Sequence, residues 1–302
     1  MSELALRARS AMHEIETHHL SHPHLKNKDL KLMQIKPVKV PYGLPGLHFL
    51  QCFVGGRGQG KTTALINEIA AYGAERVFDK LYMFSPTLHN DPKYSLLKND
   101  KYYDLKTYTS YTDEIFRDVL DEIKDDIAKW KEYEEDMKLW KRYKKAKRIE
   151  DLSDQDVLDL YLSNFMEPEA PFRKFPCSLL VFDDLAGNRE LYRSDSKGLF
   201  NSFVILHRHL GCSCIFLSQI FHNAVPRQIR TNISSWVLFQ NRNAGLKKQI
   251  AEELCGAVSP ETFLDLWDTA CKDDHDFFMI DTDSKDKKFR YRRNLNDLLI
   301  PT

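Results

Sequence analysis

The residues of this chain that are best suited to do chemistry form a glycine-rich stretch, VGGRGQGKTTALI, at positions 54–66. It has the spacing G-x-x-x-x-G-K-T, which ends in Lys61 and Thr62. Glycines let the backbone fold back so that consecutive N–H groups point inward and cradle an anion. The lysine and the hydroxyl that follow can reach the β- and γ-phosphates and a Mg²⁺ ion. The residues expected to contact such a phosphate chain are Gly55, Gly56, Arg57, Gly58, Gln59, Gly60, Lys61, Thr62 and Thr63.

The segments on either side of this stretch are those that a phosphate-binding loop requires. The apolar run LHFLQCFV (47–54) predicts a strand before the loop, and TTALINEIAAYGA (62–74) predicts a helix after it. The positive N-terminal end of that helix adds to the attraction for phosphate. In this setting the motif predicts a site for a nucleoside triphosphate with Mg²⁺.

Two neighbouring acids, Asp183 and Asp184, follow the apolar run SLLVF (178–182). A carboxylate at the end of a buried strand downstream of a P-loop can hold Mg²⁺ through water, and this is the expected role of Asp183, together with Thr62. A second carboxylate beside it, Asp184, can accept a proton from the attacking water. Switch GTPases usually have one acid at this step, so the pair favours an active hydrolase. Asp184 is one methylene shorter than the Glu that is common here.

Polar side chains further along the chain can complete such a site. Gln219 ends the run IFLSQ (215–219), where it would face the γ-phosphate and orient water or report hydrolysis; the alternative is a strand-terminal residue without a task. Arginines cluster in the same half, at Arg208, Arg227 and Arg230. A guanidinium from a neighbouring subunit can stabilise charge on the transferring phosphoryl group, and a surface ion pair is the alternative for each.

The fold that positions these residues is predicted to be α/β, with a mostly parallel central sheet flanked by helices. Continuous apolar runs of this length suit strands that are buried on both faces, and they alternate here with helical segments. A C-terminal β-hairpin is predicted around residues 283–285. The segments expected to be strands are 47–54, 80–86, 178–184, 213–219, 235–240, 277–283 and 287–293.

The predicted domain organisation is an N-terminal arm, 1–45, followed by one P-loop domain, 46–302. The arm is rich in His and Lys and is interrupted by prolines. The domain carries an insertion at about 110–170 with apolar residues at helical spacing among dense charges, which predicts a helical hairpin that returns through 152–165. Its basic stretch KRYKKAKR (141–148) is either part of a solvated helix or a tip that contacts phosphates.

Composition limits the partners of this chain. Acids and bases balance at 44 each among 302 residues, so DNA or RNA must be contacted through local basic patches. One such patch would be KDKKFRYRR (285–293), where a strand would turn Phe289 and Tyr291 to one face and Arg290 and Arg292 to the other; a charged edge strand is the alternative. The apolar runs are too short for a transmembrane segment. Six irregularly spaced cysteines indicate a reducing compartment.

Two clusters of potential metal ligands are better explained without a metal. His13, Glu14 and His18 resemble a zinc protease signature, but the second histidine falls at i+5 rather than at the i+4 position that shares a helical face. His207 and His209 are two apart on a predicted helix and do not face one another. Cys212 and Cys214, just after them, begin an apolar strand.

The order of these motifs resembles the poxvirus-type DNA-packaging ATPases of large eukaryotic DNA viruses, which belong to the FtsK–HerA superfamily of P-loop NTPases. The segments that carry the resemblance are GGRGQGKTT, FSPT, VFDD, LHRHLG, LSQ and P-x-x-IR-x-N, followed by the tail FFMIDTDSKDKKFRYRRN. It covers roughly 46–294 without the charged insertion, which departs from the family's compact pattern. The P-loop alone is generic, whereas RH, SQ and IR-x-N in this order are more specific.

The resemblance implies a RecA-like core in which the strand that ends in Gln219 lies between the P-loop strand and the acid strand. It implies an ATP-driven motor, a homo-oligomeric ring with ATP sites at subunit contacts, that moves double-stranded DNA into a preformed capsid. Capsid or packaging-vertex proteins would then be partners, and the location would be the virion or the viral factory in the host cytoplasm. By position, the catalytic residues would be Lys61, Asp184, Gln219, Arg208 and Arg230, the last two acting across a subunit contact.

Other classes of P-loop protein fit less well. A regulatory GTPase needs an N/T-K-x-D motif, and LKND (97–100) does not supply it. A small-molecule kinase would lack paired acids followed by a Gln-ended strand, and a two-domain helicase needs more chain. A nucleotide-gated scaffold, and a DNA-translocating ATPase not dedicated to packaging, remain open.

Overall fold

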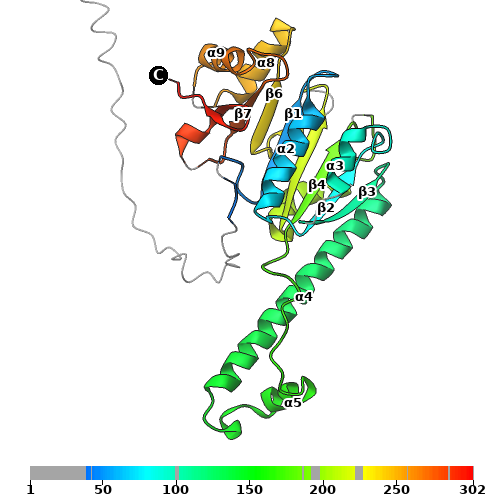
Figure 1. Ribbon diagram of the computed structural model, residues 1–302, viewed down its shortest axis with the longest axis vertical. Coiled ribbons are helices and arrows are strands. Elements are labelled where there is room, and N and C mark those ends of the chain that lie inside the picture. Colours follow the sequence, from blue (N-terminus) through cyan, green and yellow to red (C-terminus); the bar gives the residue numbers. More distant parts are fainter. Residues whose placement is uncertain are drawn as a thin grey trace, which may run out of the picture. The chain divides into compact units, whose positions relative to one another are not determined.

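A single mixed β-sheet forms the centre of the protein (Figure 1). In this computed structural model the described residues are 39–41, 43–98, 102–185, 187–191, 198–221, 227–256, 258–284 and 286–301, all within one compact unit, Lys36–Thr302. The His13–Glu14–His18 motif and most of the predicted arm lie outside the described residues, so the domain boundary at 45/46 stays a prediction. Among the described helices, none combines the length and apolar content that a bilayer span requires.

The sheet order is β3-β2-β4-β5-β1-β6-β7-β8-β9, counted over the described residues. The first six strands in this order pair in parallel and the last three in antiparallel fashion. The strands are β1 Leu50–Val54, β2 Lys80–Phe84, β3 Asp104–Tyr108, β4 Ser178–Asp183, β5 Cys212–Ser218, β6 Ser235–Phe239, β7 Phe277–Asp281, β8 Tyr291–Arg293 and β9 Asp297–Leu298. The predicted fold class is confirmed, and β5 lies between β1 and β4, as the resemblance implied.

Helices cover both faces of the parallel strands. Phe84, Phe182 and Phe216 are register partners on β2, β4 and β5, so they share one face, where Phe116 of α4 and Phe200 of α6 pack on them. α2 covers the opposite face of β1. The helices are α2 Lys61–Ala74, α3 Ser95–Lys98, α4 Asp113–Lys145, α5 Asp154–Leu162, α6 Leu199–Leu206, α7 Arg227–Arg230, α8 Ala244–Leu254 and α9 Pro260–Ala270. Short 3₁₀ turns are η1 Pro92–Tyr94, η2 Ile149–Asp151, η3 His207–Leu210 and η4 Lys287–Phe289.

The predicted helical insertion is confirmed, and its first half belongs to the core. Thr112 caps α4 by accepting a hydrogen bond from the Ile115 N–H (3.2 Å), and acids in the first turn with bases in the last complement the helix dipole. The buried residues of the first half run from Phe116 to Ile127. Beyond them α4 extends past the sheet, and α5 lies beside its far end (Figure 1). There Trp140 and Leu160 are buried between the two helices.

Two elements differ from the sequence predictions. β3 was not predicted, because its five residues, DLKTY, are only half buried at the sheet edge and carry charges. The C-terminal strands pair as expected, but Lys287–Phe289 form η4, so β8 is only three residues long. The prediction of a strand with one basic face at 285–293 is therefore wrong: the Arg292 side chain is 1% exposed, and its guanidinium lies 4.0 Å from Asp281.

A buried carboxyl group on the inner face of α2 gives the fold a measurable pH dependence. Glu68 is fully buried, and burial raises its pKa to about 8, against opposing effects from Gln51 and Arg292. The folded protein therefore keeps a proton that the unfolded chain releases near pH 4.5, so the free energy of unfolding falls as the pH rises from about 4.5 to about 8. We expect Glu68→Gln to remove this decrease in the free energy of unfolding, whose slope in the wild-type protein approaches about 1.4 kcal/mol per pH unit. Urea unfolding of the wild-type protein and of Glu68→Gln between about pH 4.5 and about pH 8 measures this difference. Parallel plots of the free energy of unfolding against pH would contradict the prediction.

Candidate nucleotide-binding site

The glycine loop joins the end of β1 to the start of α2, as the sequence predicted. Gly58 (φ 79°) and Gly60 (φ 99°) adopt left-handed conformations that other residues rarely take. A Cβ atom on Gly55 would lie 2.7 Å from the Phe239 Cβ, so only glycine fits there. The Gly55 N–H donates to the Ser218 carbonyl of β5 (3.1 Å). The loop is thus hydrogen-bonded to β5 and packs closely against Phe239 of β6.

Two side chains of the loop brace it from within. The Lys61 Nζ donates to the carbonyls of Gly55 (2.6 Å) and Gly56 (2.9 Å), so the side chain curls over the loop. Burial lowers the Lys61 pKa, and the carboxylates of Asp183 and Asp184 oppose this effect. The Gln59 side chain accepts from the Gly56 N–H and donates to the Gln240 carbonyl. Its side chain therefore supports the loop and does not line the cleft.

A cleft of about 310 Å³ lies at the carboxyl ends of β1, β4 and β5. The strand register explains this convergence, because Val54 pairs with Ser218 and Asp183 pairs with Leu217. The cleft is lined by Arg57, Gly58, Gly60, Lys61, Thr62, Thr87, Asp91, Lys93, Asp183, Asp184, Leu217 and Gln219. The structure thus brings together the predicted lysine, threonine, acids and glutamine.

Asp183 ends β4 and is nearly buried, at 7% exposed. Its Oδ2 accepts hydrogen bonds from the Tyr94 hydroxyl and from the Ser85 hydroxyl (3.2 Å). Burial raises the Asp183 pKa; these two hydrogen bonds and Lys61 oppose the rise, and Asp184 adds to it. The carboxylate therefore depends on hydroxyl donors and a nearby cation to stay ionised.

Asp184 follows in a left-handed conformation (φ 53°) and is exposed to the cleft. The Gln219 Nε2 donates to its Oδ1 over 3.2 Å. Asp and Asn tolerate this conformation better than other non-glycine residues do, which explains why an aspartate occupies the position at which glutamate is common. The predicted base and the predicted sensor are therefore in direct contact.

The donors in the cleft fit a Mg²⁺ ion bound together with a triphosphate. The Thr62 hydroxyl and the Asp183 carboxylate supply oxygen ligands, which Mg²⁺ prefers, and Mg²⁺ sites usually use one or two protein groups together with phosphates and water. Among the described residues, no group of three or more His, Cys, Asp or Glu side chains could form a dedicated metal cage. His207, Cys212 and Cys214 are buried, the two cysteines within β5.

The two predicted arginines lie away from this cleft, at the amino ends of the parallel strands. Arg208 is on η3, before β5; its side chain is 60% exposed and pairs with Asp283 (3.1 Å), which is equally exposed. Arg230 is on α7, before β6; its side chain is 9% exposed, pairs with Glu253 (2.9 Å) and lies 5.2 Å from the centre of the Phe221 ring. Neither arginine reaches the nucleotide cleft of its own chain.

Sequence reasoning missed the segment after β2 that forms one wall of the cleft. It contributes Ser85, Thr87, Asp91, Lys93 and Tyr94. The available signal was the FSPT motif, which places hydroxyl groups directly after a strand that ends beside β4. Tyr94 is ten residues from β2 in sequence, and its contact with Asp183 follows only from the fold.

A second hollow, of about 470 Å³, continues from the other side of the glycine loop and shares Gly58, Gly60 and Lys93 with the cleft. Its walls include Thr63 and Asn67 of α2 and the turn before β7, where His275 (φ 70°) lies 3.4 Å from the position of a Cβ on Gly60. Ion pairs from Arg293 to Asp273 (2.5 Å) and Asp276 (2.6 Å) hold this turn.

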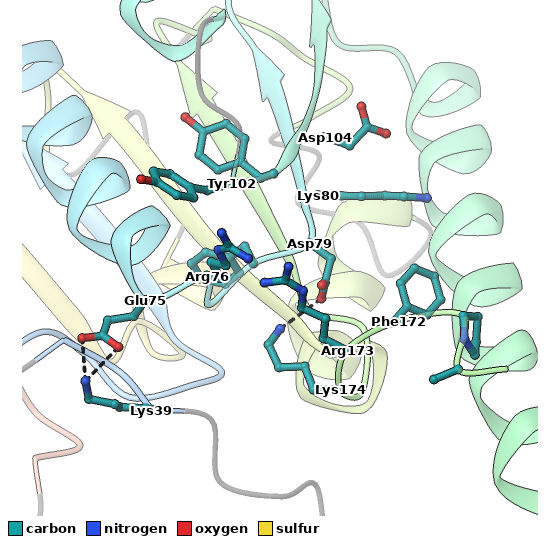
Figure 2. Close-up of a pocket in the computed structure, with 14 residues that line it drawn as sticks. Lys39, Glu75, Arg76, Asp79, Lys80, Tyr102, Asp104, Phe172, Arg173 and Lys174 are labelled. Carbon is teal, nitrogen blue, oxygen red and sulfur yellow. Dashed lines mark hydrogen bonds and ion pairs between the residues drawn. The ribbon is translucent and has the colours of Figure 1, made fainter. Parts of the chain in front are cut away.

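A third hollow lies at the amino ends of β2 and β3 and has a different character (Figure 2). Its volume is about 1060 Å³, and no residue of the glycine loop lines it. Figure 2 shows two of its cations held by carboxylates, Lys39 by Glu75 (2.7 Å) and Lys174 by Asp79 (3.0 Å). None of the predicted site residues lies here.

Comparison with known proteins bears on the fold. No protein-family model matches the sequence, and no curated protein matches it significantly. Among solved structures, the DNA-packaging ATPase B204 from Sulfolobus turreted icosahedral virus matches with a TM-score of 0.50 at 14% identity, covering 82% of this chain and 96% of that one. The chain has the fold of a viral DNA-packaging ATPase.

Two further solved structures match at lower TM-scores. The genome packaging NTPase B204 from Sulfolobus turreted icosahedral virus 2, in complex with AMP, matches with a TM-score of 0.48 at 14% identity, covering 82% of this chain and 96% of that one. The cytoplasmic domain of the type VII secretion ATPase EccC from Thermomonospora curvata matches with 0.42 at 14% identity, covering 78% and 24%. The likeness to the B204 DNA-packaging ATPase, at a TM-score of 0.50, agrees with the fold that the sequence resemblance implied.

Proposed function

We propose that this protein is an ATP-hydrolysing motor that moves double-stranded DNA into a preformed capsid. The observation that carries the proposal is the cleft at the ends of β1, β4 and β5, where Lys61, Thr62, Asp183, Asp184 and Gln219 meet. Lys61, Thr62 and Asp183 suit binding of a triphosphate with Mg²⁺, and Asp184 and Gln219 suit its hydrolysis. The fold shared with a DNA-packaging ATPase supports the choice of DNA as the substrate that is moved.

Each side chain in the cleft has a role in this proposal. Lys61 leaves the loop carbonyls and pairs with the β- and γ-phosphates, while Thr62 and Asp183 hold Mg²⁺. The bound metal offsets negative charge that builds up on the phosphates. Asp184 accepts the proton of the attacking water, and the Gln219 amide orients both the water and this carboxylate.

The nucleoside is assigned to the second hollow. The cleft of about 310 Å³ contains the metal-binding groups, and so it suits the triphosphate. The hollow of about 470 Å³ continues past Thr63 on the far side of the loop and offers the exposed imidazole of His275 as a stacking surface and the Asn67 amide as a hydrogen-bonding group. These groups suit a nucleobase.

Of the two arginines, Arg208 is the better candidate for a role across a subunit contact in a ring. Among the described residues its guanidinium pairs with the exposed Asp283, and exposed pairs contribute at most about 1 kcal/mol, so this contact can readily be exchanged for another. Arg230 is held by a two-point contact with Glu253 beneath the Phe221 ring. Arg230 is therefore assigned to the fold of its own subunit.

ATP turnover with and without double-stranded DNA tests the proposal. We expect basal hydrolysis that DNA stimulates, because a motor couples turnover to movement along its track. Lys61→Ala should abolish both rates, since it removes the cation that pairs with the phosphates. Binding of ATP without turnover, in the presence or absence of DNA, would instead support a nucleotide-gated scaffold.

A further inference from the structure

The segment between β2 and β3 closes the metal-binding end of the cleft with a buried tyrosine. Tyr94 ends η1, and only 1% of the residue is exposed. Its hydroxyl donates a hydrogen bond to Oδ2 of Asp183. This places a side chain without a role in the proposed function in direct contact with the carboxylate that is assigned to Mg²⁺.

A second hydroxyl reaches the same oxygen. The Ser85 Oγ donates to the Asp183 Oδ2 (3.2 Å) and lies 3.0 Å from the Thr87 Oγ1, whose residue lines the cleft. Within the described residues, the hydrogen bonds to the Asp183 carboxylate both end on Oδ2. The carboxylate is thereby fixed through one oxygen, and the other remains for a metal-bound water.

The tyrosine is itself held rigidly. Asp91 caps η1 by accepting from the Lys93 N–H (3.0 Å), and Pro92 occupies the first position of the turn, where its fixed φ suits a helical start. The Tyr94 N–H donates to the Asp91 carbonyl (3.2 Å).

We propose that Tyr94 is a positioning residue for Mg²⁺: its hydroxyl holds the Asp183 carboxylate in the geometry that binds the metal with the triphosphate. This inference rests on the proposed function, since it assumes that Asp183 and Thr62 hold Mg²⁺. Partners of this kind orient metal ligands, and their removal typically lowers metal affinity by about 10- to 100-fold. The binding surface for the nucleotide itself does not include the Tyr94 hydroxyl.

Nucleotide binding with and without Mg²⁺ tests the proposal. Tyr94→Phe keeps the buried ring and removes only the hydroxyl. With a fluorescent ATP analogue as the probe, we expect it to lower the apparent Mg²⁺ affinity by about 10-fold while the affinity measured in EDTA changes by less than about twofold. Ser85→Ala should have a smaller effect in the same direction. Tyr111→Phe is the matched control, because Tyr111 is 2% exposed and its hydroxyl donates to Asp113 (3.2 Å) outside the cleft.

The outcomes separate this proposal from the proposed function. An unchanged Mg²⁺ dependence in Tyr94→Phe would overturn the positioning role, and so would an equal loss of affinity in Mg²⁺ and in EDTA, which would indicate a purely structural role. Wild-type protein that binds the Mg²⁺–nucleotide complex but shows no DNA-stimulated turnover would reject the motor and leave the positioning role supported by the variant data. Wild-type protein without any nucleotide binding would overturn both.

Discussion

Asp184→Asn should reduce DNA-stimulated ATP turnover by about 100-fold or more, because general base catalysis typically contributes 10²- to 10⁴-fold. Asn keeps the shape of the side chain and an oxygen that can accept the Gln219 hydrogen bond, but it cannot take the proton of the attacking water. Asn also tolerates the left-handed backbone at this position, so the fold should be retained. The loss should therefore appear in kcat, with nucleotide affinity almost unchanged.

Steady-state turnover and equilibrium binding of an ATP analogue separate these two effects. The control variant is Asp121→Asn, which changes an exposed acid on α4 that pairs with Lys124 in the adjoining turn (2.7 Å). It should turn over ATP at the wild-type rate. If Asp184→Asn kept more than about a tenth of the wild-type kcat, a general base at this position would be excluded, since even the low end of the effect is larger.

The site could be predicted from the sequence where each functional group directly follows a buried strand. Asp183, which ends β4, and Gln219, which follows β5, belong to this class, because the carboxyl ends of parallel strands converge and an apolar run identifies each strand. Lys61 is separated from β1 by the glycine loop and was predicted from the G-x-x-x-x-G-K-T spacing. Tyr94 and Lys93 could not be predicted, since they lie in a turn after an irregular segment whose path depends on packing against α2. Local periodicity carries no information about such contacts.

The strands of the sheet also differ in how well the sequence predicts them. Strands buried on both faces, such as β4 and β5, are mostly apolar and were predicted to within one residue at each end. β3 lies at the sheet edge, and its sequence DLKTY is neither an apolar run nor a strict alternation of apolar and polar residues, so it gave no comparable signal. The prediction of an exposed basic face was wrong at Arg292. Charged residues that alternate with apolar ones along a strand normally face solvent, whereas the Arg292 guanidinium is buried near Asp281.

Phe116→Ala should lower the free energy of unfolding by about 3–5 kcal/mol, the usual loss for truncating a buried phenylalanine. Phe116 lies on the first turn of α4 and is fully buried, with its ring centre 6.0 Å from that of Phe182 on β4 and 5.2 Å from that of Phe203 on α6. The side chain thus joins the inserted helix to the strand that carries Asp183. The expected loss reflects a cavity at a three-way contact that the surrounding aromatic rings cannot easily fill.

Urea unfolding followed by circular dichroism measures this loss, with two variants for comparison. Phe116→Leu retains most of the apolar volume and should lose less, which keeps the test informative if the alanine variant does not fold. Leu162→Ala removes a side chain on α5 from a residue that is 71% exposed, and it should change stability by no more than about 0.5 kcal/mol. If Phe116→Ala lowered the free energy of unfolding by less than about 1 kcal/mol, the first turn of α4 would not contribute to the core. The expected order, Phe116→Ala above Phe116→Leu above Leu162→Ala, follows from burial alone and holds whatever the protein moves.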